Sequence, residues 1–355
     1  IMRNDIQILS KKKFLYLILD ESQKIKNTAT KISKAVMLLN GKHRLALSGT
    51  PIENNLRELY SLFRFLNPAM FGSLKEFDKY YTIPIQKNND ETVMNELRRK
   101  IYPFILRRLK KDVAKDLPPK MEQTLYIEMD SAQKKYYEQR RAFFVESIKS
   151  QVGKNGIKKS QFFIFQALSE LRQIATMPEL KNESLKSSAK KEMLIEQIQD
   201  VSAIGHKALV FSNYVGTLEI ISEELNKAGI EHLVMTGSTR DRKTLVQRFQ
   251  DDNEIKVFLM TLKTGGVGLN LTKADYVYLL DPWWNVAAEN QAVDRTHRIG
   301  QKKTVFSYKM ITKDTIEEKI LLLQQKKAEL FDNIISSDGA SVKFLSESDI
   351  DYLLS

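Results

Sequence analysis

The sequence predicts an α/β fold with parallel sheets, because apolar strand-like runs alternate along the chain with helical segments. The runs lack polar alternation, which is typical of strands buried on both faces of a parallel sheet. They are residues 14–19, 45–47, 104–106, 209–211, 257–260 and 276–280. The segments with apolar residues at helical spacing are 27–39, 55–66, 218–225, 286–298 and 315–333.

The composition indicates a basic chain with room for about two domains. Its 355 residues include 56 Lys and Arg against 44 Asp and Glu, and the net charge of +12 favours a polyanionic partner. The absence of cysteine excludes a disulfide scaffold, a cysteine-based zinc site and a cysteine nucleophile. No apolar run approaches the roughly 18 residues that a membrane span needs, so we expect no membrane partner.

Breaks in this pattern divide the chain into four predicted regions. Pro118 and Pro119 interrupt the first α/β pattern, and two amphipathic helices near 131–149 and 161–177 follow, around a polar loop at 150–160. The predicted regions are an α/β part at 1–117, a helical insertion and linker at 118–189, a second α/β part at 190–333 and a tail at 334–355.

Polar side chains follow the first two predicted strands. Asp20 and Glu21 come directly after the first strand, and Ser48 and Thr50 follow the second. In open α/β sheets the carboxyl ends of strands form the ligand-binding edge. Two carboxylates there suit a nucleotide-hydrolysing site, one holding Mg²⁺ through water and the other polarising the attacking water. Solvated turns with no chemical role are the alternative for both segments.

The second α/β part carries a glycine-rich loop and a pair of arginines. Glycines in residues 263–270 let backbone amides approach a phosphate closely, although a plain flexible loop has the same composition. Arg295 and Arg298 are three residues apart in a predicted helix, and two guanidinium groups on one face suit a highly charged phosphate. A surface helix with ion pairs to Asp294 and Glu289 is the alternative.

Two adjacent tryptophans precede this helix. Trp283 and Trp284 are the only tryptophans in the chain. Successive residues of an extended segment point in opposite directions, so one ring can pack in the core while the other contacts a ligand. Core packing of both rings is the alternative.

The order of these segments resembles the motifs of the SWI/SNF-type DNA translocases, a branch of helicase superfamily two. Leu19 to Asn27 resembles motif II, Leu47 to Asn55 resembles motif III, and Gln291 to Gln301 resembles motif VI. The remaining matches are motif IV at 208–214, the element at 236–242, motif V at 261–271 and the segment at 281–285. The resemblance covers nearly the whole chain.

The resemblance implies RecA-like parallel-sheet lobes, one partial and one complete, with a helical insertion between them. It also implies ATP and magnesium as cofactors, double-stranded DNA as partner, DNA-bound protein as cargo, and a location in the cytoplasm and nucleoid, or in the nucleus of a eukaryote.

The same resemblance implies roles for individual residues. Asp20 would coordinate magnesium through water, and Glu21 would activate the hydrolytic water. Arg295 and Arg298 would be arginine fingers that reach the γ-phosphate. The implied ATP-binding residues beside Asp20 are Gly266, Gly268 and Gln291. Ser48 and Thr50 would couple the ATP state to the grip on DNA. The implied DNA-binding residues are Ser212, Asn213, Thr261, Lys263 and Trp284.

The sequence departs from the family pattern in one way that bears on activity. No G-x-x-x-x-G-K-[ST] phosphate loop occurs in it, and the family places that loop before motif II. We therefore expect the first lobe to lack its front part and the chain alone to hydrolyse ATP poorly. Two other functions remain open: an inert DNA- or protein-binding scaffold on a degenerate ATPase fold, and an RNA helicase of the same superfamily. Smaller departures are Val286, where the family commonly has proline, and residues 175–177, which replace a commoner cysteine-containing stretch.

Overall fold

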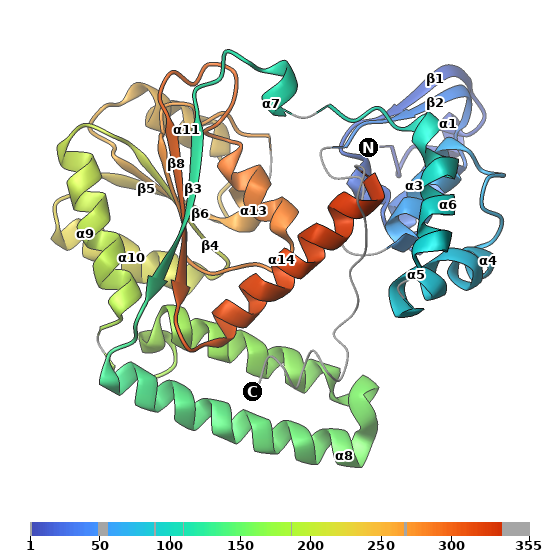
Figure 1. Cartoon of the computed structure of the whole chain (residues 1–355). Coiled ribbons are helices and arrows are strands. Elements are labelled where there is room, and N and C mark those ends of the chain that lie inside the picture. The colour runs from blue at the N-terminus through green and yellow to red at the C-terminus, as the bar shows by residue number, and fades with distance from the viewer. Residues whose placement is uncertain are drawn as a thin grey trace. The chain divides into compact units, whose positions relative to one another are not determined.

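The computed structural model describes residues 2–48, 56–88, 90–108, 110–185, 187–265 and 268–335. It divides into two compact units, which Figure 1 shows with their elements labelled. Unit 1 holds the residues up to Arg107 together with the end of the last helix from Gln325, and unit 2 holds Arg108–Gln324. Each unit contains a parallel sheet, as the sequence predicts.

Unit 1 contains a two-stranded parallel sheet in its described part. Strands β1 (Lys13–Leu19) and β2 (Asn40–Ala46) pair in parallel, from Lys13 opposite Asn40 to Leu19 opposite Ala46. The helices around them are α1 (Ile6–Leu9), η1 (Ser22–Ile25), α2 (Lys31–Met37), α3 (Leu56–Leu66), α4 (Leu74–Phe77), η2 (Asp78–Thr82), α5 (Ile83–Asn88), α6 (Glu91–Ile101) and η3 (Tyr102–Phe104). Phe63, Phe77 and Leu97 lie at the centre of the helical core.

Two expectations for unit 1 are wrong. Residues 104–106 do not form a strand, because Pro103 lies in the 3₁₀ turn η3 and no strand among the described residues pairs with 104–106. Strand β1 is not buried on both faces either, since Leu17 is buried but Tyr16 and Ile18 are 59% and 57% exposed. Leu17 packs with Val36 and Phe65.

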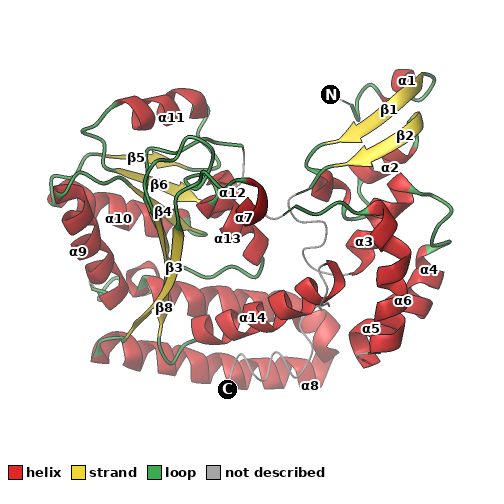
Figure 2. Cartoon of the chain, turned by 45° about the horizontal axis from the view of Figure 1, so that its top comes forward, coloured by secondary structure: helices red, strands yellow, loops and turns green. Residues whose placement is uncertain are grey.

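Unit 2 contains a six-stranded parallel sheet in its described part, with strand order β3-β8-β7-β4-β6-β5 (Figure 2). The strands are β3 (Lys120–Ile127), β4 (Ala208–Ser212), β5 (His232–Met235), β6 (Val257–Thr261), β7 (Tyr276–Leu279) and β8 (Val305–Thr312). The helices are α7 (Lys110–Val113), α8 (Ser131–Thr176), η4 (Pro178–Leu180), α9 (Ala189–Ala203), α10 (Val215–Lys227), α11 (Arg242–Asp251), α12 (Leu262–Gly265), α13 (Val286–Val293) and α14 (Ile316–Ile335).

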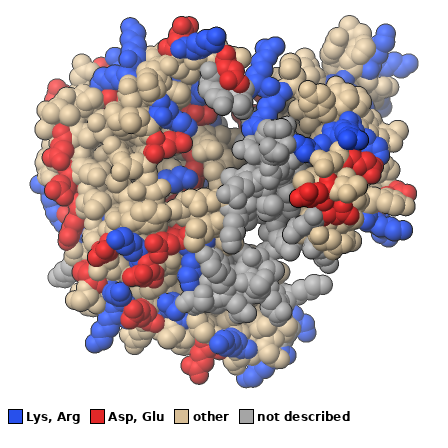
Figure 3. Space-filling model, viewed as in Figure 1, with Lys and Arg blue, Asp and Glu red and all other residues tan. Residues whose placement is uncertain are grey.

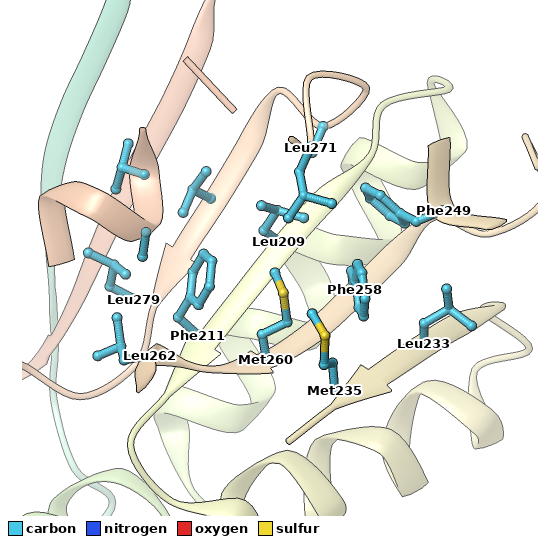
Figure 4. Close-up of a cluster of buried hydrophobic side chains, with 14 of the residues drawn as sticks. Leu209, Phe211, Leu233, Met235, Phe249, Phe258, Met260, Leu262, Leu271 and Leu279 are labelled. Carbon is cyan, nitrogen blue, oxygen red and sulfur yellow. The ribbon is translucent and has the colours of Figure 1, made fainter. Parts of the chain in front are cut away.

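Helices cover both faces of this sheet, and every residue of β4 and β6 is buried, as their unbroken apolar runs predict. On one face, residues of β4 and β6 pack against α9 and α10. On the other face, Phe211, Phe258 and Met260 pack with Phe249 of α11 and with α13 (Figure 4). The fully buried central strands place their carboxyl ends, and the loops that follow them, at one edge of the sheet.

The region predicted as a helical insertion contributes a strand as well as helices. Strand β3 pairs in parallel with β8 along its whole length, from Lys120 opposite Val305 to Ile127 opposite Thr312. This edge strand buries only Ile127 and mixes polar with apolar residues, so it lacks the apolar run that marks β4 and β6. Strands β5 and β8 were not predicted either.

The two predicted helices are the arms of the α8 hairpin, but the segment between them is helical rather than a polar loop. Helical structure continues through 150–160 and is interrupted only at Gly156, whose φ of 72° favours glycine. The two arms lie side by side in Figure 1, and Arg140 of the first arm donates to Glu170 of the second at 2.7 Å. None of the described helices is long and apolar enough to span a bilayer.

Candidate functional site

The carboxyl ends of β1 and β2 lie side by side and carry the first group of predicted site residues. The Leu47 amide donates to the Leu19 carbonyl at 2.7 Å, and the Ser22 amide donates to the Leu47 carbonyl at 2.9 Å. These bonds bring the segment after β1 next to Ser48. Thr50, which was predicted to act with Ser48, lies outside the described residues.

Glu21 has a left-handed backbone conformation, with φ 53° and ψ 48°. A residue with a Cβ atom pays about 1–3 kcal/mol for a sparsely populated conformation, and such residues cluster at functional sites. The bend turns the chain from β1 directly into η1 and leaves Asp20 and Glu21 exposed at the strand end. The strain is therefore located at the residue to which the family resemblance gives the water-activating role.

Gln23 connects the two predicted groups and was missed by the sequence reasoning. Its amide nitrogen donates to the Glu21 carboxylate, and its amide oxygen accepts from the Ser48 hydroxyl at 3.3 Å. A change at Glu21 can thus reach Ser48 through one side chain. Gln23 lies inside the segment that resembles motif II, but its amide is not titratable and therefore does not mark it as a candidate site residue.

The donors at this edge fit a magnesium ion that shares its coordination with phosphate and water. One oxygen of Asp20 accepts from the Glu21 amide at 2.9 Å, and the carboxylate is exposed. Among the described residues no group of three or more His, Asp or Glu is placed to hold a metal. Magnesium is commonly held by only one or two carboxylates beside substrate phosphates and water, which one exposed Asp satisfies.

In unit 2, Asp281 is the centre of the polar groups at the ends of β4 and β7. Its carboxylate is 1% exposed and accepts from the Ser212 hydroxyl at 2.6 Å and from the Asn213 amide at 2.9 Å. The Asn213 side chain also donates to Asp281. Ser212 is completely buried, so its side chain cannot contact DNA in this conformation and instead anchors the loop.

The glycine-rich segment follows β6, as predicted. Thr261 is 8% exposed and its hydroxyl is hydrogen-bonded to Thr264, so little of its side chain is accessible to DNA. Lys263 is exposed. Gly268 is exposed and has φ 43°, and Gly266 lies outside the described residues.

The two predicted arginines lie beyond the end of α13 rather than on one helical face. Helix α13 ends at Val293, and i→i+3 bonds such as Arg295 amide to Ala292 carbonyl tighten the chain there. Arg295 Nε donates to the Gly265 carbonyl at 3.0 Å, which joins this segment to the glycine-rich one. Arg298 is exposed in the turns that follow.

The carboxylates suggested as partners of these arginines pair with lysines. Asp294 lies 2.8 Å from the Lys110 ammonium, and buried Glu289 lies 2.8 Å from that of Lys309. Glu289 also accepts from the Trp283 amide at 2.7 Å. The surface-helix alternative had these two carboxylates pair with the arginines, whereas their ion pairs here are with Lys110 and Lys309.

Both tryptophans are half-buried, so their exposure does not distinguish a core ring from a ligand-contacting ring. Trp283 packs against the core cluster shown in Figure 4, and its carbonyl accepts from Gln324. Trp284 is half-buried, and Gln291 is half-buried on α13.

Comparison with known proteins decides the family. Residues 1–180 match the model of the SNF2-related domain, and residues 189–300 match that of the helicase conserved C-terminal domain. The chain belongs to the SNF2-related family. Its predicted resemblance and its α/β fold class are thereby confirmed.

Several relatives of this SNF2-related chain are similar over nearly all of its length. It is 40% identical to the putative ATP-dependent helicase/translocase YwqA of Bacillus subtilis, over 94% of this chain and 37% of the relative. It is 37% identical to an uncharacterized ATP-dependent helicase of Mycoplasma pneumoniae, over 95% of this chain and 32% of the relative. The chain thus spans about a third of the length of these relatives.

A solved structure from the same family gives a similar result. The Sulfolobus solfataricus SWI2/SNF2 ATPase core in complex with double-stranded DNA has a TM-score of 0.55 and 35% identity, covering 99% of this chain and 75% of that chain.

Proposed function

We propose that this SNF2-related chain is part of an ATP-dependent motor that moves along double-stranded DNA. The observation that carries the proposal is the carboxylate pair on the strained bend after β1, linked to Ser48 through Gln23. A protein that only binds DNA gains nothing from strain at an exposed carboxylate, whereas a hydrolytic site needs a fixed one.

The two carboxylates have different tasks in this proposal. Asp20 holds the magnesium ion of Mg·ATP, which neutralises charge on the phosphates. Glu21 accepts a proton from the attacking water, and the Gln23 amide donates a hydrogen bond to its carboxylate. Gln23 and Ser48 couple a change at the Glu21 carboxylate to the end of the neighbouring strand β2 through their hydrogen bonds. We assign Thr50 to the same coupling role.

The arginines of unit 2 stabilise the charge that develops on the γ-phosphate. We assign this task to Arg295, whose Nε is anchored on Gly265, and to exposed Arg298. An arginine finger is worth about 10³–10⁵ in rate. Gly266, Gly268 and Gln291 are assigned to nucleotide binding.

The DNA-binding residues are assigned to the loops after β4, β6 and β7. Exposed Lys263 contacts the phosphate backbone, while Asn213 and Trp284 contact the duplex. The side chains of Ser212 and Thr261 are buried, so we assign them to anchoring these loops rather than to contacting DNA. On the face shown in Figure 3, Lys and Arg side chains mix with those of Asp and Glu.

Relatives suggest what such a motor acts on. Similar proteins include the human TATA-binding protein-associated factor 172, at 35% identity, and the yeast ISWI chromatin-remodeling complex ATPase ISW1, at 33%. We propose that the natural protein displaces or moves proteins bound to DNA, and that it acts where the cell keeps its DNA.

The decisive experiment compares ATP hydrolysis by the natural protein that contains these residues with duplex DNA, single-stranded DNA and RNA. We expect duplex DNA to stimulate hydrolysis most, and Glu21→Gln to abolish the stimulated rate while leaving DNA affinity unchanged. Stimulation by RNA alone would favour an RNA helicase, and a rate that Glu21→Gln does not change would favour an inert scaffold. Because its sequence has no phosphate loop, the 355-residue chain alone should hydrolyse ATP poorly.

A further inference from the structure

Arg172 is a buried arginine whose contacts lie outside its own helix. It belongs to the second arm of α8, and its side chain is 3% exposed. Its Nη2 donates to the Pro282 carbonyl at 2.6 Å and lies 3.6 Å from the Asp281 carboxylate. Its guanidinium carbon is 5.5 Å from the centre of the Tyr214 ring and 5.4 Å from that of the Trp283 ring.

The internal packing of the α8 hairpin does not account for Arg172. The two arms are joined by Arg140 with Glu170, and by Gln133, whose side-chain amide donates to the Ile174 carbonyl at 2.9 Å. Arg172 reaches instead to the loops after β4 and β7. A buried cation is costly unless a carboxylate, a carbonyl or an aromatic face compensates it, and these two loops supply all three.

The groups that hold Arg172 also hold the residues that we assign to DNA. Asp281 accepts from the Asn213 amide and side chain as well as pairing with Arg172. Trp283 stacks on Arg172 and is joined directly to Trp284. A shift of the second arm of α8 would therefore move the positions of Asn213 and Trp284 together.

We propose that Arg172 is a positioning residue, which couples the orientation of the α8 hairpin to the loop 281–285 and to Asn213 and thereby sets the DNA-contacting surface. The part of this proposal that concerns DNA rests on the proposed function. The coupling itself is independent of DNA, so the two can be tested separately.

Tryptophan fluorescence tests the coupling directly, since the chain has only two tryptophans. In a Trp284→Phe background of the full chain, Trp283 is the sole reporter. Arg172→Met should shift its emission to longer wavelength and increase quenching by acrylamide. Arg172→Lys should do the same, because an ammonium group lacks the planar face that stacks between two rings. Arg140→Met is the matched control on the same hairpin, and it should leave the emission unchanged.

The coupling is overturned if both Arg172 variants show the emission and the quenching of the parent. If Arg172→Met does not fold, the charge-conserving Arg172→Lys decides by the same criterion. An Arg140→Met variant that changes Trp283 as strongly as Arg172→Met would also overturn the proposal, because any loosening of the hairpin would then be sufficient.

Fluorescence anisotropy with a labelled duplex tests the consequence for DNA, using chains that keep both tryptophans. Arg172→Met should weaken binding about tenfold, which is the size expected if the displaced loop loses about one charge-assisted contact with DNA. Unchanged affinity would refute the positioning role. Unchanged affinity in both Trp284→Ala and Asn213→Ala would instead refute the assignment of these residues to DNA, while the fluorescence result for Arg172 would stand.

Discussion

The ion pair between Lys190 and Glu317 allows a stability prediction with a definite size. Lys190, at the start of α9, and Glu317, at the start of α14, are 1% and 0% exposed, and their charged atoms lie 2.5 Å apart. The Lys190 ammonium also donates to the Leu280 carbonyl at 2.8 Å. Burial lowers the pKa of Lys190, and the Glu317 carboxylate opposes that change. We predict that Lys190→Met strongly destabilises unit 2.

The size of the effect follows from what remains after the substitution. Removing one partner of a buried ion pair costs about 3–5 kcal/mol, because the other charge is left uncompensated. Glu317 still accepts from the Thr176 hydroxyl and the Thr312 amide, both at 2.8 Å, which partly satisfy it. The loss in free energy of unfolding for Lys190→Met should therefore be near the lower limit, at about 3 kcal/mol. Glu317→Leu should cost more, about 5 kcal/mol, because it also removes both of these hydrogen bonds.

Urea unfolding followed by tryptophan fluorescence measures this effect, since both tryptophans lie in unit 2. The double variant Lys190→Met with Glu317→Leu should be less destabilised than the sum of the two single variants, since neither charge is then left alone. Lys227→Met, which removes an exposed ion pair on α10, is the control and should leave the midpoint unchanged. A loss below about 1 kcal/mol for Lys190→Met, or additive single effects, would refute the reasoning.

Three further predictions concern other parts of the chain. Gly41→Ala should destabilise the β1–β2 pair by about 1–3 kcal/mol, because the new Cβ would lie 2.5 Å from Leu17 Cγ. Faster hydrogen exchange in residues 13–46 would show this destabilisation, and unchanged exchange would contradict the prediction. Gly265→Ala should destabilise unit 2 by a similar amount, because its Cβ would lie 2.4 Å from the Phe211 ring; a normal urea midpoint would refute this. Burial raises the pKa of Tyr137, Tyr214 and Tyr278 above the ordinary 10.0, so the folded chain keeps protons that the unfolded chain releases. The contribution of these tyrosines to the free energy of unfolding is fully present below pH 10 and is lost as the pH rises further. The urea midpoint should therefore fall above about pH 10, and it should fall less in Tyr137→Phe. An equal alkaline decline in that variant would contradict the assignment to Tyr137.

The sequence alone predicted a feature correctly wherever the residues that determine it lie within one short segment. Strands β4 and β6 were predictable because a strand covered on both faces needs an apolar residue at every position. Asp20, Glu21 and Ser48 were predictable as a group because parallel strands end at the same edge of their sheet. The family motifs are of the same kind, since each is a short run of residues with a fixed order.

Local patterns failed where a neighbour decides the structure. Strand β3 mixes polar with apolar residues and buries only Ile127, and it forms a strand because its backbone pairs in parallel with eight residues of β8. Strand β1 has an apolar run but is not buried on both faces, because burial depends on what covers a sheet rather than on its own residues. The helix that was predicted to carry Arg295 and Arg298 ends at Val293, where i→i+3 bonds replace the helical pattern.

By itself, then, the sequence determined the family, the parallel α/β class and the carboxylate pair after β1, because each of these is encoded in the types and order of neighbouring residues. Only the tertiary structure decided that Ser212 is buried and bonded to Asp281, that Gln23 joins Glu21 to Ser48, and that Arg172 contacts a loop more than a hundred residues away. The physical reason is that a buried polar group needs a partner, and the chain's path through space determines which distant residue becomes that partner.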